Sequence, residues 1–338
     1  MRIVVGSEPG KYQCDFFRVT GRARPADDRL GASYRSTSSR PRCPAVGVTA
    51  AVGDKHYLAG QYPSERCDEC FGDTRLSDTW VNGGTPAYIL SDAGYDVWMG
   101  NARGNTYSRR HASLKPTSSA FWKFSWHEIG YYDLPAMIDY VLKETKVPKI
   151  QYIGFSQGTT VFWVLMSTRS EYNEKVAAMQ ALAPVAYIGN IKSPLIKAIA
   201  PFTNSLETML PVVMGHTPAG ASTRQLIHFG QLYKSDKFVQ FDHGWLTNKR
   251  IYGTFKPPAY NLGVIKTPVF LHYADNDWLS TPKDVKKLAA KIPSVVGTFR
   301  VPLGKFNHLD FVFAINATEL IYSRVLNIMS QFKNQTSN

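Results

Sequence analysis

The segment from Lys149 to Arg169 constrains the fold more than any other part of this 338-residue chain. It starts with an apolar, β-prone run, passes through Gly154-Phe-Ser-Gln-Gly158 and continues as an apolar helical pattern. A G-x-S-x-G motif between a strand and a helix is typical of a nucleophile elbow, where the serine lies on a sharp turn above the end of a sheet. Glycines fit both flanking positions, since a Cβ there would collide with the strand or the helix. The segment therefore predicts an α/β protein with Ser156 as its nucleophile.

Strand and helix signals alternate from about Ser77 onward, and this pattern favours a mostly parallel sheet flanked by helices. Apolar runs predict strands over residues 95–99, 176–184, 268–274 and 297–302. Apolar stripes predict a helix that begins at Asp133, another after Thr281 and a last one over residues 320–329. Pro and Gly interrupt residues 185–255, which we interpret as a helical insertion over the sheet.

Residues 1–70 differ in composition from the rest of the chain. Arg, Ser, Pro and Gly dominate residues 18–45, and neither a strand period nor a helix period is sustained there. The sequence therefore predicts a poorly structured leader over residues 1–70. The expected α/β domain covers residues 71–338 and contains the insertion at about 185–255.

Composition and charge exclude several functional classes. The net charge is +13, but Lys and Arg are spread without a long block, which indicates a basic solvated surface with no nucleic-acid role and at most an accessory role in docking on lipid. No apolar run approaches the roughly 18 residues of a membrane span, and the N-terminal run is too short for a signal peptide. Cys67 and Cys70 lack a second C-x-x-C or a His pair, so we expect no metal and no cofactor.

A nucleophilic serine needs a base that takes its proton, and the base needs an acid that fixes its tautomer. In α/β hydrolases the chain order is Ser, then Asp or Glu, then His. Only His308, among the histidines after Ser156, falls in a loop between the last predicted strand and the last helix, and it is the candidate base. The acid is Asp275 or Asp277, which topology alone does not separate. His272 falls within a strand and is interpreted as a core residue.

The tetrahedral intermediate also requires two N–H donors for its negative oxygen. One is the backbone N–H of Gln157, directly after the nucleophile and at the positive end of its helix. The second should come from a loop after an early strand, around Phe71-Gly72-Asp73, with the backbone N–H of Asp73 as the candidate.

Seven segments together carry a family pattern: residues 76–80 (LSDTW), 91–111 (SDAGYDVWMGNARGNTYSRRH), 132–136 (YDLPA), 154–160 (GFSQGTT), 215–221 (GHTPAGA), 276–279 (NDWL) and 307–311 (NHLDF). They resemble the acid lipases, the family of lysosomal acid lipase and gastric lipase, from about residue 76 to the C-terminus. The resemblance implies an α/β-hydrolase fold in which Ser156 is the nucleophile, His308 the base and Asp277, rather than Asp275, the acid. It also implies hydrolysis of neutral lipid esters (triacylglycerols or sterol esters) at an oil–water or membrane interface. The implied setting is secreted or lysosomal, without metal or cofactor.

The chain departs from the family pattern in several places. The oxyanion loop is His-Gly-Leu-Leu in the family and Phe71-Gly-Asp-Thr74 here, and a carboxylate at Asp73 would repel the developing charge. The upstream family sequence has no counterpart in residues 1–70, so the resemblance implies that the first strands of the sheet are missing. The residue before the nucleophile is usually His and is Phe155 here, which we expect to change packing rather than the path of the proton. The cap at about 185–255, which should bind the substrate, is shorter than in the family.

The leading hypothesis is therefore a serine lipase or esterase with the triad Ser156, Asp277 and His308. One alternative is a catalytically impaired or non-catalytic lipase remnant, from an incompletely assembled coding sequence; the unmatched leader and the altered oxyanion loop motivate it. Another alternative is a short-chain carboxylesterase, which the reduced cap would favour.

Overall fold

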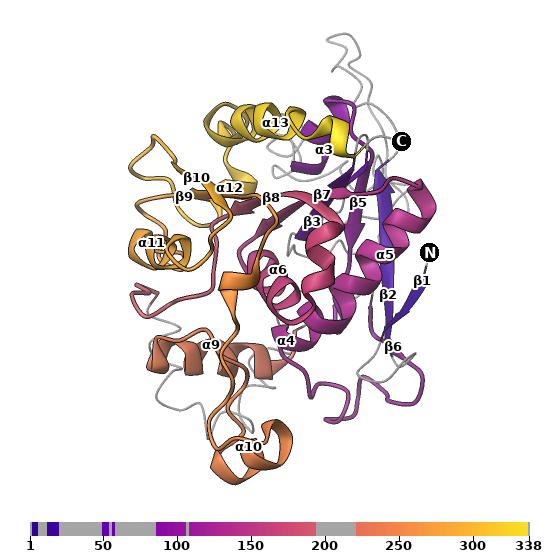
Figure 1. Ribbon diagram of the computed structural model, residues 1–338, viewed down its shortest axis with the longest axis vertical. Helices are drawn as coiled ribbons and strands as arrows, with labels where there is room; N and C mark the ends of the chain where they lie inside the picture. Colours follow the sequence, from indigo (N-terminus) through magenta and orange to yellow (C-terminus); the bar gives the residue numbers. More distant parts are fainter. Residues whose placement is uncertain are drawn as a thin grey trace, which may run out of the picture.

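The protein is built around one central sheet with helices on both faces (Figure 1). The computed structural model describes residues 2–5, 12–19, 49–53, 56–57, 86–105, 108–193 and 221–336, with side chains from residue 86 onward. The strands are β1 (Arg2–Val5), β2 (Tyr12–Val19), β3 (Thr49–Gly53), β4 (His56–Tyr57), β5 (Val97–Gly100), β6 (Arg110–His111), β7 (Ile150–Phe155), β8 (Val176–Leu182), β9 (Val269–Tyr273) and β10 (Val295–Arg300). The α-helices are α3 (Pro86–Asp92), α4 (Trp126–Glu128), α5 (Leu134–Thr145), α6 (Gln157–Thr168), α9 (Thr223–Ser235), α10 (Trp245–Tyr252), α11 (Pro282–Ala289), α12 (Asp310–Phe313) and α13 (Ser323–Ser330).

The strand order is β1-β2-β5-β4-β3-β7-β8-β9-β10, with β6 paired to β2. The pairs β7–β8, β8–β9 and β9–β10 are parallel. β3 is antiparallel to both β7 and β5, so β5 runs in the same direction as β7. Parallel neighbours need crossover connections, which the helices between the strands supply. The predicted α/β fold, with a mostly parallel sheet flanked by helices, is confirmed.

The described segments of residues 1–70 are the strands β1 to β4, in a region where the sequence predicted none. β2 pairs antiparallel with β5, placing Phe16 opposite Gly100, and β3 lies between β5 and β7, placing Ala51 opposite Tyr152. The expectation that the first strands are missing is therefore wrong for these segments. The expectation failed because each of these strands is stabilised by hydrogen bonds to a partner strand far away in the chain, and local composition does not reveal such partners.

The two faces of the sheet are covered by different helices (Figure 1). Tyr152 of β7 packs in a core with residues of α5, α6 and α11, whereas its neighbour Ile153 packs with residues of α3, α12 and α13. This alternation follows from the two-residue period of a strand. α6 is buried at every position from Gly158 to Met166, which explains why its sequence is apolar on all sides.

The helix expected to begin at Asp133 is α5, which begins at Leu134 but continues a helical run that starts earlier, at α4. Ser125 caps α4 by accepting from the His127 N–H, while the Glu128 side chain accepts from the Ser125 N–H. α4 continues through a π-helical turn into α5, so Asp133 lies inside the helical run. Its buried carboxylate accepts from both the side chain and the backbone N–H of Arg103 instead. This ion pair ties the loop after β5 to the helix, and removing one partner would leave a buried charge uncompensated.

Between β8 and β9 the chain leaves the sheet. The described part of this connection includes α9 and α10, which lie together at one end of the molecule (Figure 1). Both helices fall within the insertion expected at about 185–255. α9 is joined to the body by His228, whose ring stacks on Trp126 with centroids 3.8 Å apart. None of the helices in the described ranges is long and apolar enough to cross a membrane.

His228 and His272 are fully buried and held neutral by their surroundings. The Nε2 atom of His272, on β9, lies 3.0 Å from Gln180 Oε1, as expected for a core histidine. His228 of α9 donates from Nε2 to the Val239 carbonyl at 3.0 Å. Burial lowers the pKa of both histidines to about 3, because the charged imidazolium would lose its hydration.

We expect stability to fall with acidification through these two groups. The unfolded chain binds a proton at each histidine below a pKa of 6.5, but the folded chain does so only near 3, so unfolding takes up protons between these values. The free energy of unfolding should therefore decrease by about 1.4 kcal/mol per pH unit for each histidine as the pH falls through this window. In urea unfolding between pH 3 and 6.5, the free energy of unfolding of His272→Gln should depend less steeply on pH than that of the unmodified protein. The difference in slope should correspond to the uptake of one proton, about 1.4 kcal/mol per pH unit. Equal slopes would contradict this assignment.

Candidate active site

Ser156 lies on the turn between β7 and α6, as the sequence predicted. Its φ of +52° and ψ of −118° place a non-glycine residue in a strained conformation, which costs about 1–3 kcal/mol. A Cβ at Gly154 would lie 2.9 Å from the carbonyl carbon and oxygen of Gly158, so only glycine fits there. Two hydrogen bonds keep the backbone in this conformation. The Ser156 N–H donates to the Leu182 carbonyl at 3.0 Å, and Thr159 Oγ1 donates to the Ser156 carbonyl at 2.7 Å. The serine is therefore presented on a rigid turn.

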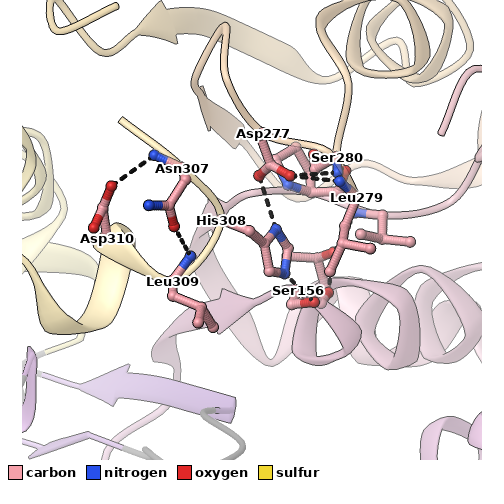
Figure 2. Close-up of polar contacts among 11 residues, drawn as sticks. Ser156, Asp277, Leu279, Ser280, Asn307, His308, Leu309 and Asp310 are labelled. Atoms are coloured by element: carbon pink, nitrogen blue, oxygen red, sulfur yellow. Dashed lines mark hydrogen bonds and ion pairs between the residues drawn. The ribbon is translucent and has the colours of Figure 1, made fainter. Parts of the chain in front are cut away.

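Three side chains far apart in the sequence meet at this turn (Figure 2). His308 Nε2 lies 2.8 Å from Ser156 Oγ, and His308 Nδ1 lies 2.8 Å from Asp277 Oδ2. An ionised carboxylate can only accept, so in this tautomer Nδ1 carries the proton and Nε2 presents its lone pair to the serine hydroxyl. This is the geometry in which an imidazole can remove the proton of an attacking hydroxyl.

The Asp277 carboxylate is completely buried and well supplied with donors. Its Oδ1 accepts from the backbone N–H groups of Leu279 and Ser280 at 2.8 and 2.7 Å (Figure 2). These bonds leave Oδ2 to orient the imidazole, and they compensate the loss of hydration on burial. Asp275 points elsewhere, since its carboxylate pairs with Arg300 Nε at 2.7 Å on the exposed surface. The structure therefore separates the two aspartates that topology left open.

The loop that carries His308 is braced by its own neighbours (Figure 2). The Asn307 N–H donates to Asp310 Oδ2 at 2.7 Å, and the Leu309 N–H donates to Asn307 Oδ1 at 2.9 Å. The ring of Phe155 packs against the imidazole with centroids 4.9 Å apart. His308 is only 8% exposed, so its ring is held from several sides in the orientation that proton transfer requires.

Of the two predicted oxyanion donors, Gln157 lies within the described residues and Asp73 does not. Gln157 is the first residue of α6, and the first N–H groups of a helix have no acceptor within the helix. Its side-chain Nε2 donates to Gln225 Oε1 of α9 at 2.7 Å, and Gln225 is nearly buried. Sequence reasoning missed Gln225, because no local pattern in α9 marks the residue that faces the elbow. Asp73 lies outside the described residues, so the second donor stays a prediction.

Within the described ranges, no three His, Cys, Asp or Glu side chains come close enough together to hold a metal ion. Cys67 and Cys70 lie outside those ranges. The groups that meet at the elbow are the Ser156 hydroxyl, the His308 imidazole and the Asp277 carboxylate, which are the side-chain components of acyl transfer.

Comparisons with known proteins define the class of the chain. The alpha/beta hydrolase fold family matches residues 77–217. The solved structure of a soluble variant of monoglyceride lipase from Saccharomyces cerevisiae, in complex with a substrate analog, aligns over 100% of this chain and 96% of its own with a TM-score of 0.52. At 14% sequence identity this likeness shows the fold alone. The chain is an α/β hydrolase.

Sequence relatives identify the family within this class. The chain is 42% identical to Lipase 1 of Drosophila melanogaster over 72% of its length and 66% of the relative, just under two thirds of that protein. It is 40% identical to Lipase 3 of the same organism, over 76% of the chain and 79% of the relative. It is 35% identical to gastric triacylglycerol lipase of Bos taurus, over 73% and 74%. The chain therefore belongs to the acid lipase family that includes gastric lipase, a family of carboxylic ester hydrolases.

Proposed function

We propose that this protein hydrolyses neutral lipid esters, triacylglycerols or sterol esters, through an acyl-enzyme formed on Ser156. The observation that carries the proposal is the continuous hydrogen-bonded line from Asp277 through His308 to Ser156. The lipase names of its relatives support the substrate class. The same ordered line favours an active enzyme over a non-catalytic remnant, because strained and buried polar groups are held in a productive arrangement.

The reaction would proceed in two half-reactions. Ser156 Oγ attacks the ester carbonyl while its proton passes to His308 Nε2, and Asp277 stabilises the imidazolium that forms. The backbone N–H of Gln157 stabilises the negative oxygen of the tetrahedral intermediate, together with a second donor that we place at Asp73. His308 then protonates the leaving alcohol. A water molecule, activated by the same imidazole, releases the fatty acid from Ser156, and the scheme uses neither a metal nor a cofactor.

We place the acyl chain of the substrate beneath the insertion at about 185–255. The contact between Gln157 and Gln225 supports this placement, since it brings α9 of the insertion directly against the elbow. A secreted or lysosomal setting, and an oil–water or membrane interface as the site of action, are proposed from the family resemblance.

A fluorophosphonate probe tests the proposed nucleophile. The probe should modify Ser156, detected by peptide mass spectrometry, because only an activated serine reacts at an appreciable rate. A cooperative thermal melt of the same sample provides the control for folding. A folded sample without modified Ser156 would refute the proposal. Rates on soluble short-chain esters and on emulsified long-chain triacylglycerols would then distinguish a short-chain carboxylesterase from a lipase.

A further inference from the structure

α10 and the loop after it expose large apolar side chains at the end of the molecule. Trp245 is 64% exposed, Leu246 63% and Phe255 52%. Exposed apolar side chains that gather in one place, with polar side chains around them, mark interaction sites. Together with Lys249 and Arg250, which are also exposed, these residues are called the α10 face below.

The members of the α10 face lie next to one another. The rings of Trp245 and Phe255 have centroids 5.6 Å apart, and Lys249 Nζ lies 5.4 Å from the centroid of Phe255. Trp245 and Lys249 are one helical turn apart, as are Leu246 and Arg250, so the apolar and basic side chains share one side of the helix. Figure 1 shows α10 at the extremity of the molecule, beyond α9 and remote from α13.

This face is already ordered in the free protein. Asn248 is buried beneath it, and its Nδ2 donates to Asp242 Oδ1 at 2.8 Å and to the Phe255 carbonyl at 3.1 Å. The Tyr252 hydroxyl donates to the Phe241 carbonyl at 2.8 Å, which fixes the helix on its base. These bonds join the helix to the returning loop, so binding would require little further ordering.

The charge around this face is mainly positive, and the nearest carboxylate along the sequence, Asp242, accepts from the Gly244 N–H and the Asn248 side chain. Residues 244–258 contain Lys249, Arg250 and Lys256, all exposed, and neither Asp nor Glu. A second copy of the chain docked through the same face would bring like charges together, because a two-fold interface pairs a surface with itself. Aromatic side chains that enter the boundary between water and acyl chains, with Lys and Arg next to the headgroups, are instead the features of an interfacial helix.

We infer that the α10 face docks the enzyme on a lipid surface that carries anionic phospholipid headgroups. The inference deepens the proposed function and rests on it, since a lipid ester substrate is presented at such a surface. Trp245, Leu246 and Phe255 enter the interface, while Lys249 and Arg250 contact phosphate and carboxylate groups. α9, which adjoins α10, holds the elbow near this surface through Gln225.

Vesicle co-sedimentation tests the inference without requiring catalysis. The probes are vesicles of phosphatidylcholine alone and vesicles with about one third phosphatidylserine. Trp245→Ala should weaken binding to the anionic vesicles about 10-fold or more, because a large apolar side chain no longer leaves water. The double variant Lys249→Gln with Arg250→Gln should weaken it about 10- to 30-fold on anionic vesicles and leave the weak binding to neutral ones unchanged. The matched control is Val296→Ala, since Val296 is 64% exposed on β10, and it should bind as the unmodified protein does.

Unchanged affinity of Trp245→Ala for anionic vesicles would overturn the inference, and so would a decrease no larger than that of Val296→Ala. A loss of self-association in Trp245→Ala without a change in vesicle binding would also overturn it, in favour of a second copy of the chain. Turnover of a soluble short-chain ester is measured in parallel and should be equal in all variants. Vesicle binding without ester turnover by the unmodified protein would refute the proposed function and leave the docking surface standing. Ester turnover together with vesicle binding that does not change in the α10-face variants would refute the docking surface and leave the proposed function standing.

Discussion

Replacing Ser156 with alanine should lower kcat for ester hydrolysis about a million-fold, to the level that binding and the oxyanion donors alone sustain. The reason is that Ser156 Oγ lies 2.8 Å from His308 Nε2, and alanine lacks this atom. Steady-state turnover of a soluble short-chain ester gives the measurement. Ser167→Ala, in the same helix, is a matched control, since the Ser167 hydroxyl donates to the Val164 carbonyl one turn earlier, and it should leave kcat unchanged.

The same position offers a second readout that is independent of activity. Ser156→Gly should be as inactive as the alanine variant, yet more stable by about 1 kcal/mol, because glycine adopts a φ of +52° without strain. A Ser156→Ala variant that retained activity within about 100-fold of the unmodified protein would show that another group is the nucleophile.

Asp277→Asn should lower kcat about 10⁴-fold, while Asp275→Asn should change it little. An asparagine amide at position 277 can donate to His308 Nδ1, which then has to accept, and the proton moves to Nε2 where it blocks proton removal from Ser156. Asp275 instead forms an exposed ion pair with Arg300, and such pairs contribute about 0–1 kcal/mol to stability.

Kinetics of the two variants on one soluble ester, with thermal melts of both, give the comparison. Because the two aspartates are two residues apart in one loop, they form a matched pair for charge and location. Equal losses of activity in both variants, or a loss confined to Asp275→Asn, would contradict the assignment of Asp277 as the acid.

The sequence predicted the elbow well because its determinants are local. The crowding at Gly154 and the apolar run after Ser156 depend on residues within a few positions of each other, and the structure shows both. The positions of the loops that carry Asp277 and His308 followed from the order of strands and helices along the chain. The choice between Asp275 and Asp277 did not follow from that order, since both lie in the same loop.

The prediction that the first strands are missing, and that of Asp133 as a capping side chain, were wrong for a different reason. The strands β2 and β3 are held by pairing with β5 and β7, about 80 to 100 residues away, and local composition carries little information about such partners. Asp133 has the identity of a helix cap, but the buried guanidinium of Arg103 takes up its carboxylate, and the capping box lies at Ser125, at the start of the helical run that leads into α5.

What the sequence determined by itself is the class of fold, the elbow that carries Ser156 and the loops that carry Asp277 and His308, because each is encoded in short motifs and in the periodicity of single elements. Only the tertiary structure decided which aspartate meets His308, that Gln225 reaches the elbow from α9, and that Trp245 and Phe255 form one exposed surface with Lys249. These contacts join elements that fold at a distance from one another along the chain, so they depend on packing between layers rather than on the local preferences of any segment.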